Sequence, residues 1–547
     1  MFLDSVHPVA RDERVRDYLL PKRILKIFGE VKDTDVLFEE KNRQSSLREA
    51  KTAILHSVPG NHAALLLDFG FEFHGGVSIS TAMCPNNTHL RLRFGESARE
   101  AMAELGEKGA CNDHSPRDFT ALISPLSQLE FGATGYRFLY IELLDEDCTI
   151  SLRAIQGVFL HQPYEFAGSF VCSDETLNKI YDTAAYTCHL CLQNELWDGI
   201  KRDRLVWIGD MAPEMKTIEY VFGEVPQIMS GLEFAEENGR AEWIDTMPTY
   251  SLWWLINLQE WSAYCGKPEF ILRNKTYCLD VIRRVLASIG TDGSFLPDNF
   301  IDWPSRGTGA EPAGAKALLA MALKASVKLA QALKEDDLAE TCRAVYEKQL
   351  TLREDAKGYK QIAALLQLNG MADEKAQALL AEGKPEGLST FMSYYILSAM
   401  AQLTDTQTVL NALKTYYGGM LDLGATTFWE DFDLAWMKNA CKLDELDETK
   451  SDIHGDNGKF CYIGYRHSLC HGWSSGPVPF LTEQVLGIRV SGEGGSVVTI
   501  EPHLGELTFA RGSIATPLGK LTVEHKQENG KILTTYQAPA GMKVILK

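Results

Sequence analysis

The sequence predicts a multidomain chain in which a large helical domain lies between two β-rich domains. Three observations support this fold class. Strand-like segments, one of them with alternating apolar and polar residues, occupy the chain from about residue 50 to 165, and a helical spacing replaces them near Ser173. Strand-like segments return after about residue 482. A chain of 547 residues is also longer than one hydrophobic core usually organises. The expected domains are 1–165, 166–481 and 482–547.

The N-terminal domain is expected to be an antiparallel β-sandwich. "HLRLRF" (89–94) alternates apolar and polar residues, as a strand with one buried face does. "YRFLYIELL" (136–144) and "CTISLRAIQGVFL" (148–160) are rich in β-branched and aromatic residues. Turn residues separate these segments. A smaller β-domain is expected at the C-terminus, from "SVVTIEP", "GELTFARGSIATPLGKLTVEHK" and "KILTTYQAPAGMKVILK".

The middle of the chain is expected to form a helical toroid. Its first helix lies in "SDETLNKIYDTAAYTCHLCLQN" and opens with the capping pair Ser173-Asp174. Long loops such as "TDGSFLPDNFIDWPSRGTG" connect the helices, whereas simple bundles use short connections. Further helices are expected at 267–290, 315–334, 336–350, 388–403 and 406–420.

Composition excludes several classes of function. The net charge of −20 argues against nucleic acid, because phosphate binding needs a basic face. No apolar run approaches the roughly 20 residues of a membrane span. The start, "MFLDSVHPVARDERVRDYLL", lacks an apolar signal core, so a cytoplasmic protein is expected unless a leader has been trimmed. A homo-oligomer stays open.

Twelve cysteines are scattered through mostly apolar contexts. This pattern is typical of reduced, buried thiols rather than of a disulfide framework. Cys188 and Cys191 form a C-x-x-C, but no second pair lies nearby, so a zinc site is not expected. We expect neither a metal nor another cofactor.

All ten tryptophans fall between Trp197 and Trp473, inside the helical region. Some of them must belong to the core. Others stand in polar loops, such as Trp303 in "FIDWPSRG" and Trp429 in "TTFWEDFD". Sugars bind with their C–H faces on aromatic rings while charged groups take the hydroxyls, so these loops suggest a carbohydrate pocket.

The stretch "WDGIKRDRLVWIGD" (197–210) contains six charged residues and two tryptophans in fourteen positions. We expect a loop up to about Val206 and a helix from Met211 to Phe222, which puts Asp210 and Glu214 on one helix face. The apolar residues around the loop should draw it inward. Charges drawn inward need partners, which Arg202 and Arg204 supply. The alternative is a surface network of ion pairs.

A second acidic stretch is "GATTFWEDFD" (424–433), with Glu430, Asp431 and Asp433 next to Trp429. Cleavage of a glycosidic bond needs two carboxyl groups in different protonation states on either side of that bond. Two acidic loops, more than 200 residues apart, are a plausible way to bring such a pair together.

Two other motifs have weaker claims. "GWSSG" (472–476) satisfies the G-x-S-x-G pattern of serine esterases around Ser474, but Pro477 and Pro479 follow it and only a small β-domain remains. His467 and His471 have the spacing of a metal pair, but Gly472 interrupts any helix there. A structural or sugar-binding histidine is the preferred interpretation.

Four motifs resemble the α-L-rhamnosidases of glycoside hydrolase family 78. "DGIKRDRLVWIGD" resembles the family pattern D-C-P-x-R-D-E-R-x-G-W-x-G-D, and "TTFWEDFD" resembles its T-x-W-E segment. "FIDWPS" is similar to its Y-G-D-W loop, and "HSLCHGWSSGPVPFL" to its S-L-N-H stretch. The β-rich segment 91–143 also resembles the β-sandwich that precedes the barrel, so the likeness covers roughly residues 50 to 547. The resemblance implies an (α/α)6 barrel flanked by β-sandwiches, and hydrolysis of rhamnosides with inversion.

The resemblance also implies roles for individual residues. Glu430 matches the general base. The substrate-binding set would comprise Asp198, Arg202, Trp207, Asp210, Trp303, Trp429 and His471.

The chain departs from the family at the general acid. The family's R-D-E-R has become Arg202-Asp203-Arg204, which removes the acid glutamate. Asp203 is the preferred replacement, Glu214 the second candidate and Glu195 the third. Two alternatives therefore stay open: a degenerate barrel that binds carbohydrate without turnover, or a glycosidase for a different sugar.

Overall fold

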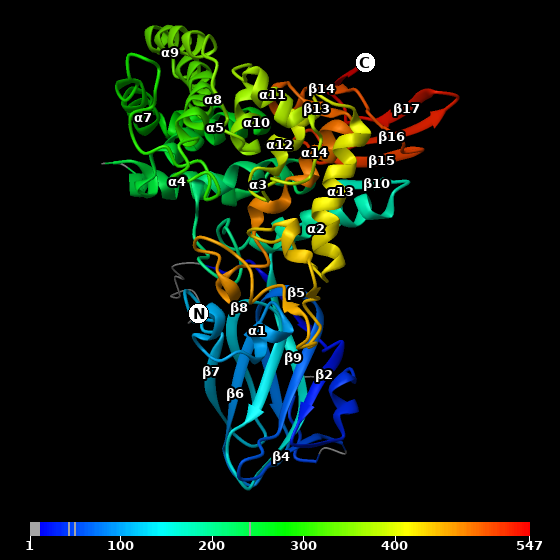
Figure 1. Cartoon of the computed structure of the whole chain (residues 1–547). Helices are drawn as coiled ribbons and strands as arrows, with labels where there is room; N and C mark the ends of the chain where they lie inside the picture. Colours follow the sequence, from blue (N-terminus) through cyan, green and yellow to red (C-terminus); the bar gives the residue numbers. More distant parts are fainter. Residues whose placement is uncertain (1–10, 42–43, 49–50, 240–241) are drawn as a thin grey trace, which may run out of the picture.

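The computed structural model describes residues 11–41, 44–48, 51–239 and 242–547 (Figure 1). A β-rich part, a helical part and a second β-rich part follow one another along the chain. The prediction of a multidomain chain with a helical centre is confirmed. No helix within the described residues is long and apolar enough to cross a lipid bilayer.

The N-terminal part is a nine-stranded antiparallel sheet in the order β3-β4-β9-β5-β8-β6-β7, with β1 paired to β9 and β2 to β5. The three strands predicted from the sequence lie within β6, β8 and β9. The sheet encloses a hydrophobic core of its own around Phe73 and Tyr136. The strands are β1 (Val15–Leu19), β2 (Arg23–Phe28), β3 (Glu30–Lys32), β4 (Ala53–Ser57), β5 (Ala64–Thr81), β6 (Thr88–Gly95), β7 (Asp118–Ile123), β8 (Gln128–Leu143) and β9 (Cys148–His161).

Six helices of the central part form a closed cycle of contacts. They are α3 (Ile208–Val221), α5 (Pro248–Cys265), α8 (Glu311–Ala332), α10 (Lys360–Leu368), α12 (Ser393–Met400) and α14 (Pro477–Gln484). Each helix contacts the next, and α14 contacts α3 again. A cycle of this kind is what a helical toroid requires.

Seven further helices pack against this cycle or against one another. They are α2 (Glu175–Cys191), α4 (Pro226–Gly239), α6 (Glu269–Arg273), α7 (Lys275–Ala287), α9 (Asp336–Gln349), α11 (Glu374–Ala381) and α13 (Thr406–Asp422). Asp174 caps α2 by accepting hydrogen bonds from the backbone of Thr176 and Leu177, as the predicted capping pair requires. The helix predicted at 267–290 is two helices, which meet at Asn274.

The C-terminal strands share a hydrophobic core with the helices, because Val498 and Ile514 belong to the same cluster as the helical residues. A four-stranded sheet has the order β10-β15-β16-β17, and a three-stranded sheet has the order β13-β14-β18. β10 precedes the first long helix, so the chain enters the helical part through the C-terminal sheet. These strands are β10 (Ser169–Cys172), β13 (Ile488–Val490), β14 (Val497–Ile500), β15 (Phe509–Ile514), β16 (Leu521–Glu528), β17 (Lys531–Gln537) and β18 (Lys543–Leu546).

A segment between α13 and α14 returns to the N-terminal sheet, and Figure 1 shows it beside α1 (Ala98–Met102) and β8. It contains the short strands β11 (Ala440–Cys441) and β12 (Ser451–Asp452). The Ala98 amide donates a hydrogen bond to the Leu443 carbonyl, and Lys108 pairs with Asp456. The segment therefore joins the first β-rich part to the helical part.

All twelve cysteines lie in the described part of the chain without a disulfide, and nine of them are buried. Burial raises the pKa of the Cys188 and Cys191 thiols well above its ordinary value. The prediction that most of the thiols are buried is confirmed.

Candidate active site

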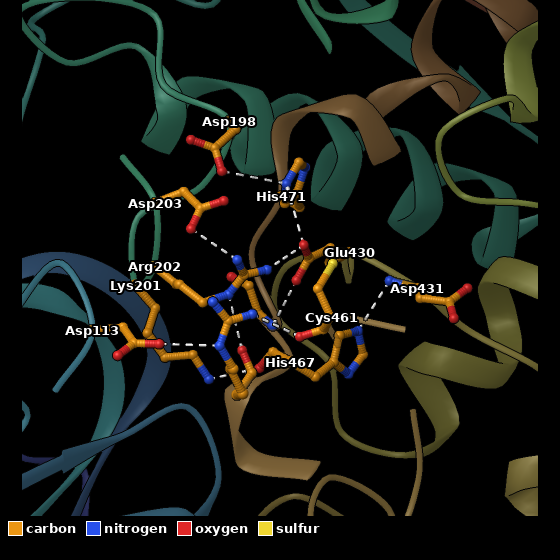
Figure 2. A network of polar contacts seen from close by, with 12 residues as sticks. Asp113, Asp198, Lys201, Arg202, Asp203, Glu430, Asp431, Cys461, His467 and His471 are labelled. Atoms are coloured by element: carbon orange, nitrogen blue, oxygen red, sulfur yellow. Dashed lines mark hydrogen bonds and ion pairs between the residues drawn. The ribbon is translucent and has the colours of Figure 1, made fainter. Parts of the chain in front are cut away.

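Three segments distant in the sequence meet where the helical part faces the N-terminal sheet (Figure 2). They are the loop 192–207 between α2 and α3, the segment 424–433 after α13, and the segment 467–473 before α14. The Gly472 amide donates to the Asp198 carbonyl at 2.8 Å, and the Glu430 amide donates to the Ser468 carbonyl at 3.0 Å. These backbone hydrogen bonds bring the two acidic loops of the sequence together.

Glu430 is buried with a guanidinium as its partner. Its side chain is 4% exposed, forms an ion pair with Arg202 and accepts a hydrogen bond from the Ser468 amide at 3.1 Å. Burial alone raises its pKa, but the charges of Arg202 and His471 outweigh burial and lower the pKa to about 2. Glu430 is therefore ionised at any physiological pH.

Asp203 lies on the other side of Arg202. Its Oδ1 accepts from Arg202 Nη1 at 2.8 Å and lies 3.2 Å from His114 Nε2. Asp203 and Arg204 both have a left-handed backbone, with φ of 55° and 54°. This turn holds the Asp203 carboxyl group next to the Arg202 guanidinium.

His471 lies among three buried carboxyl groups. Its Nε2 is 3.6 Å from Asp198 Oδ2, 3.9 Å from Glu430 Oε1 and 4.0 Å from Asp210 Oδ2. Burial lowers the pKa of His471, but the ion pair with Asp198 and the charges of the other carboxylates raise it above the ordinary value. Burial raises the pKa of Asp198, and it raises that of Asp210 well above the usual range. The His471 imidazole thus lies within 4.0 Å of a carboxylate oxygen of each of these three acids.

Asp210 and Glu214 both lie on α3, as predicted, but in different surroundings. Tyr250 donates a hydrogen bond to Asp210 at 3.2 Å. Glu214 is 1% exposed and packs against Gly472, where a Cβ atom would come within 2.0 Å of Glu214 Oε1. Burial raises the pKa of Glu214 well above its ordinary value. The third candidate acid, Glu195, accepts from Ser230 at 2.7 Å.

A small cavity lies beside Glu430. In this conformation its volume is about 10 Å³, which is room for about one water molecule. Its wall is mainly aromatic and also carries three carboxyl groups. The lining residues are Phe300, Asp302, Trp303, Pro304, Ser389, Phe391, Glu430, Asp431, Tyr462 and Trp473.

The predicted tryptophans take different places around this cavity. Trp303 lines it and stacks on Phe460, with ring centroids 6.2 Å apart. Trp207 is half-buried and contacts Tyr250. Trp429 is 1% exposed and packs on Phe432, so in this conformation it lies within the core. Trp473 stands in a third polar tryptophan loop, "CHGWSSG", but was not predicted as a site residue; it lines the cavity, and its Nε1 donates to the Glu430 carbonyl at 2.9 Å.

Asp302 was also missed, although it stands in the quoted segment "FIDWPS". Its place next to Trp303 in a polar loop was the available signal. Asp431 was noted, but not as a site residue; burial raises its pKa to about 7.

In the G-x-S-x-G motif and in the His467–His471 pair, Ser474 and His467 form hydrogen bonds within the protein. Ser474 is fully buried, and its hydroxyl donates to the His471 carbonyl at 2.5 Å, so it has no free path to a substrate. His467 Nε2 accepts from the Asp431 amide at 2.9 Å. These contacts support the structural interpretation of both motifs.

Replacing Arg202 with methionine is expected to shift the acid limb of the pH–rate profile to higher pH. Without the guanidinium, burial dominates at Glu430 and its pKa rises from about 2. Glu430 therefore picks up a proton at a higher pH, and the loss of activity is larger at pH about 5 than at pH about 7. Measuring kcat/KM against pH tests this.

Arg204→Met is the matched control, because Arg204 lies in the same loop but donates to the carbonyls of Ala133 and His114. Its acid limb should stay in place. An unchanged limb in the Arg202 variant would contradict the assignment of the low pKa to this ion pair.

The comparisons with known proteins agree with this geometry. Residues 165–267 match the family described as the bacterial alpha-L-rhamnosidase 6 hairpin glycosidase domain. No curated protein matches the chain in sequence. The family 78 rhamnosidase of Bacillus sp. GL1 has a similar fold, with a TM-score of 0.76 and 20% identity over 94% of this chain and 55% of that one.

Two further solved structures resemble the chain. A rhamnosidase from Klebsiella oxytoca with rhamnose bound has a TM-score of 0.65 and 19% identity over 86% of this chain and 96% of that one. A Streptomyces avermitilis α-L-rhamnosidase complexed with L-rhamnose has a TM-score of 0.68 and 16% identity over 95% of this chain and 50% of that one. The chain thus spans about half the length of the Bacillus and Streptomyces proteins.

Residues 165–267 thus match a six-hairpin glycosidase domain, and the fold of the chain is similar to the folds of α-L-rhamnosidases. The family whose motifs the sequence resembles is therefore also the family that these comparisons find.

Proposed function

We propose that the protein is an inverting α-L-rhamnosidase that removes terminal rhamnose from glycosides or polysaccharides. The six helices in cyclic contact would form the (α/α)6 barrel, with 1–165 and 482–547 as flanking β-domains. The observation that carries the proposal is Glu430, an ionised carboxylate held beside an aromatic cavity of sugar-binding character. The Klebsiella structure has rhamnose bound and the Streptomyces structure is a complex with L-rhamnose, which favours this sugar.

In this mechanism Glu430 takes a proton from a water molecule as the water attacks the anomeric carbon. An inverting enzyme holds its acid roughly 6.5–9.5 Å from the base, which leaves room for that water. Asp203 and Glu214 are the acids expected from the sequence. Asp198, Asp210 and His471 would hold ring hydroxyls, and Trp303, with Trp207 and Trp429, would face the C–H groups of the sugar.

A panel of nitrophenyl glycosides tests the substrate class. We expect nitrophenol release from the α-L-rhamnoside and little from other hexosides. Proton NMR of the first product should show the β-anomer, because inversion changes the configuration at the anomeric carbon. If nitrophenol is released from another glycoside and not from the rhamnoside, that other sugar is the substrate instead of rhamnose. A first product with the α-configuration would contradict inversion.

The second candidate is a carbohydrate-binding protein without turnover. The deletion beside Asp203 favours it, because the family's acid glutamate has no counterpart at that place. Calorimetry that detects rhamnose binding to a chain inactive on every glycoside would support this alternative.

A further inference from the structure

The proposed reaction needs a proton donor that the Arg202–Arg204 loop supplies poorly. Asp203 is paired with Arg202 at 2.8 Å and lies 3.2 Å from His114. Both contacts are made by Oδ1, and Asp203 is not among the described residues that line the cavity beside Glu430. The cavity beside Glu430 has two other carboxyl groups in its wall, Asp302 and Asp431.

Asp302 has one oxygen that is occupied and one that is free. Its Oδ1 accepts hydrogen bonds from the Ser305 amide at 3.0 Å and from the Ser305 hydroxyl. Its Oδ2 is buried and has no hydrogen-bond partner among the described residues. The residue is 2% exposed. A proton on Asp302 therefore belongs on Oδ2, where it can be donated to a ligand.

The surroundings keep Asp302 and Glu430 in different protonation states. Burial raises the pKa of Asp302 to about 6, although Ser305 and the Gln361 amide oppose the rise and Glu311 adds to it. The pKa of Glu430 in the same cavity is lowered to about 2. The remaining titratable groups of the wall are Asp431 and Tyr462. Two carboxyl groups whose pKa values are pushed apart can act as an acid and a base.

Asp431 is the weaker candidate for the acid. It follows Glu430 directly in the chain, and Figure 2 shows its carboxyl group pointing away from Glu430 and Arg202. Its Oδ1 accepts from the Phe432 amide at 2.9 Å. An acid and a base in adjacent positions are poorly placed to flank one bond.

We propose that Asp302, through its free Oδ2, is the catalytic acid of this site and replaces the glutamate that the family motif has lost. This inference rests on the proposed glycosidase function. The Asp302 proton passes to the glycosidic oxygen, which also takes the electron pair of the breaking bond to the anomeric carbon. Water forms the new bond to that carbon and gives its proton to Glu430. Exchange of protons with solvent restores both carboxyl groups.

The dependence of the rate on the leaving group tests this role with Asp302→Asn. We expect kcat on methyl α-L-rhamnoside to fall by about 10²–10⁴-fold, the usual contribution of an acid. On 2,4-dinitrophenyl α-L-rhamnoside the loss should stay below about tenfold, because that leaving group departs without protonation. The alkaline limb of the pH profile should also disappear. Asp302→Glu, which keeps a carboxyl group, should restore part of the rate on the methyl glycoside.

Asp203→Asn and Asp431→Asn are the matched controls. Equal losses of Asp302→Asn on both substrates, or the selective loss appearing in Asp203→Asn instead, would overturn the proposal while the glycosidase function stands. A wild type inactive on every glycoside would instead refute the proposed function, and this inference with it.

A second readout does not depend on activity. Because the folded pKa of Asp302 lies above the ordinary value, the folded state holds an extra proton between about pH 4 and 6. Stability from this group is present below that window and is lost as pH rises through it. Asp302→Asn should therefore gain stability relative to wild type between about pH 4 and pH 7 in urea unfolding. A pH-independent difference would show that Asp302 does not hold this proton.

Discussion

Replacing Glu430 with glutamine is expected to lower kcat on an aryl α-L-rhamnoside by about 10²–10⁴-fold, the range for a lost general base. Glutamine keeps the shape of the side chain and can still accept from Arg202 and the Ser468 amide. It cannot take a proton from water. KM should change much less than kcat, because Glu430 acts in the chemical step.

The same substitution removes the charge that faces Arg202. The guanidinium is buried, and among the described residues Asp203 is the charged partner that it retains. We therefore expect a lower urea midpoint as well, and activity must be measured where the variant is folded. Glu448→Gln, at an exposed site, is the control and should leave both quantities unchanged. Activity close to wild type in a folded Glu430→Gln would remove Glu430 from the mechanism.

Replacing Lys201 with methionine is expected to lower the free energy of unfolding by about 3–5 kcal/mol, the usual effect of breaking a buried ion pair. Lys201 Nζ lies 2.7 Å from Glu96 and 3.2 Å from Glu100, both of which are buried. It also donates to the carbonyls of Tyr465 and His467 at 2.9 and 2.6 Å. One ammonium group thus joins the N-terminal sheet to two segments of the site.

The loss should grow with pH. Burial raises the pKa of Glu96, and burial with the Glu96 charge raises the pKa of Glu72 well above its ordinary value. Without Lys201 these carboxyl groups hold protons in the folded state to a still higher pH, so deprotonation destabilises the variant as pH rises. Urea unfolding at about pH 5 and pH 8 measures the difference.

Lys267→Met is the control for Lys201→Met. Lys267 pairs with Glu224 at the surface, where both side chains are more than a third exposed. Exposed pairs contribute roughly 0–1 kcal/mol, so this variant should unfold close to wild type. If the free energy of unfolding of Lys201→Met also changes by so little, water rather than Lys201 stabilises the buried carboxyl groups of Glu96 and Glu100.

Much of the fold could be predicted because patterns of neighbouring residues indicate its helices and strands. β6 alternates in burial along its first residues, and α13 has helical spacing and an Asp405 cap. Other elements had no such pattern. α5 is buried on nearly all sides, so its apolar residues show no face. The break between α6 and α7 at Asn274 depends on packing and had no proline or glycine to mark it.

The site could be predicted only in part. The two acidic loops were recognised, and the structure brings Glu430 to Arg202 as two such loops would need. Asp302 and Lys201 were not singled out, although Asp302 stands next to Trp303 in one of the four motifs. Their importance comes from neighbours far away in the chain: the cavity wall around Asp302, and Glu96 and Glu100 around Lys201.

The sequence by itself determined the order of β-rich and helical parts, the family resemblance and the segments that carry the acids. These features are local, since periodicity and short motifs are read over a few neighbouring residues. Only the tertiary structure decided which acid is ionised and which holds a proton. That choice depends on burial and on charges within a few ångströms, and the fold supplies both by bringing together residues hundreds of positions apart.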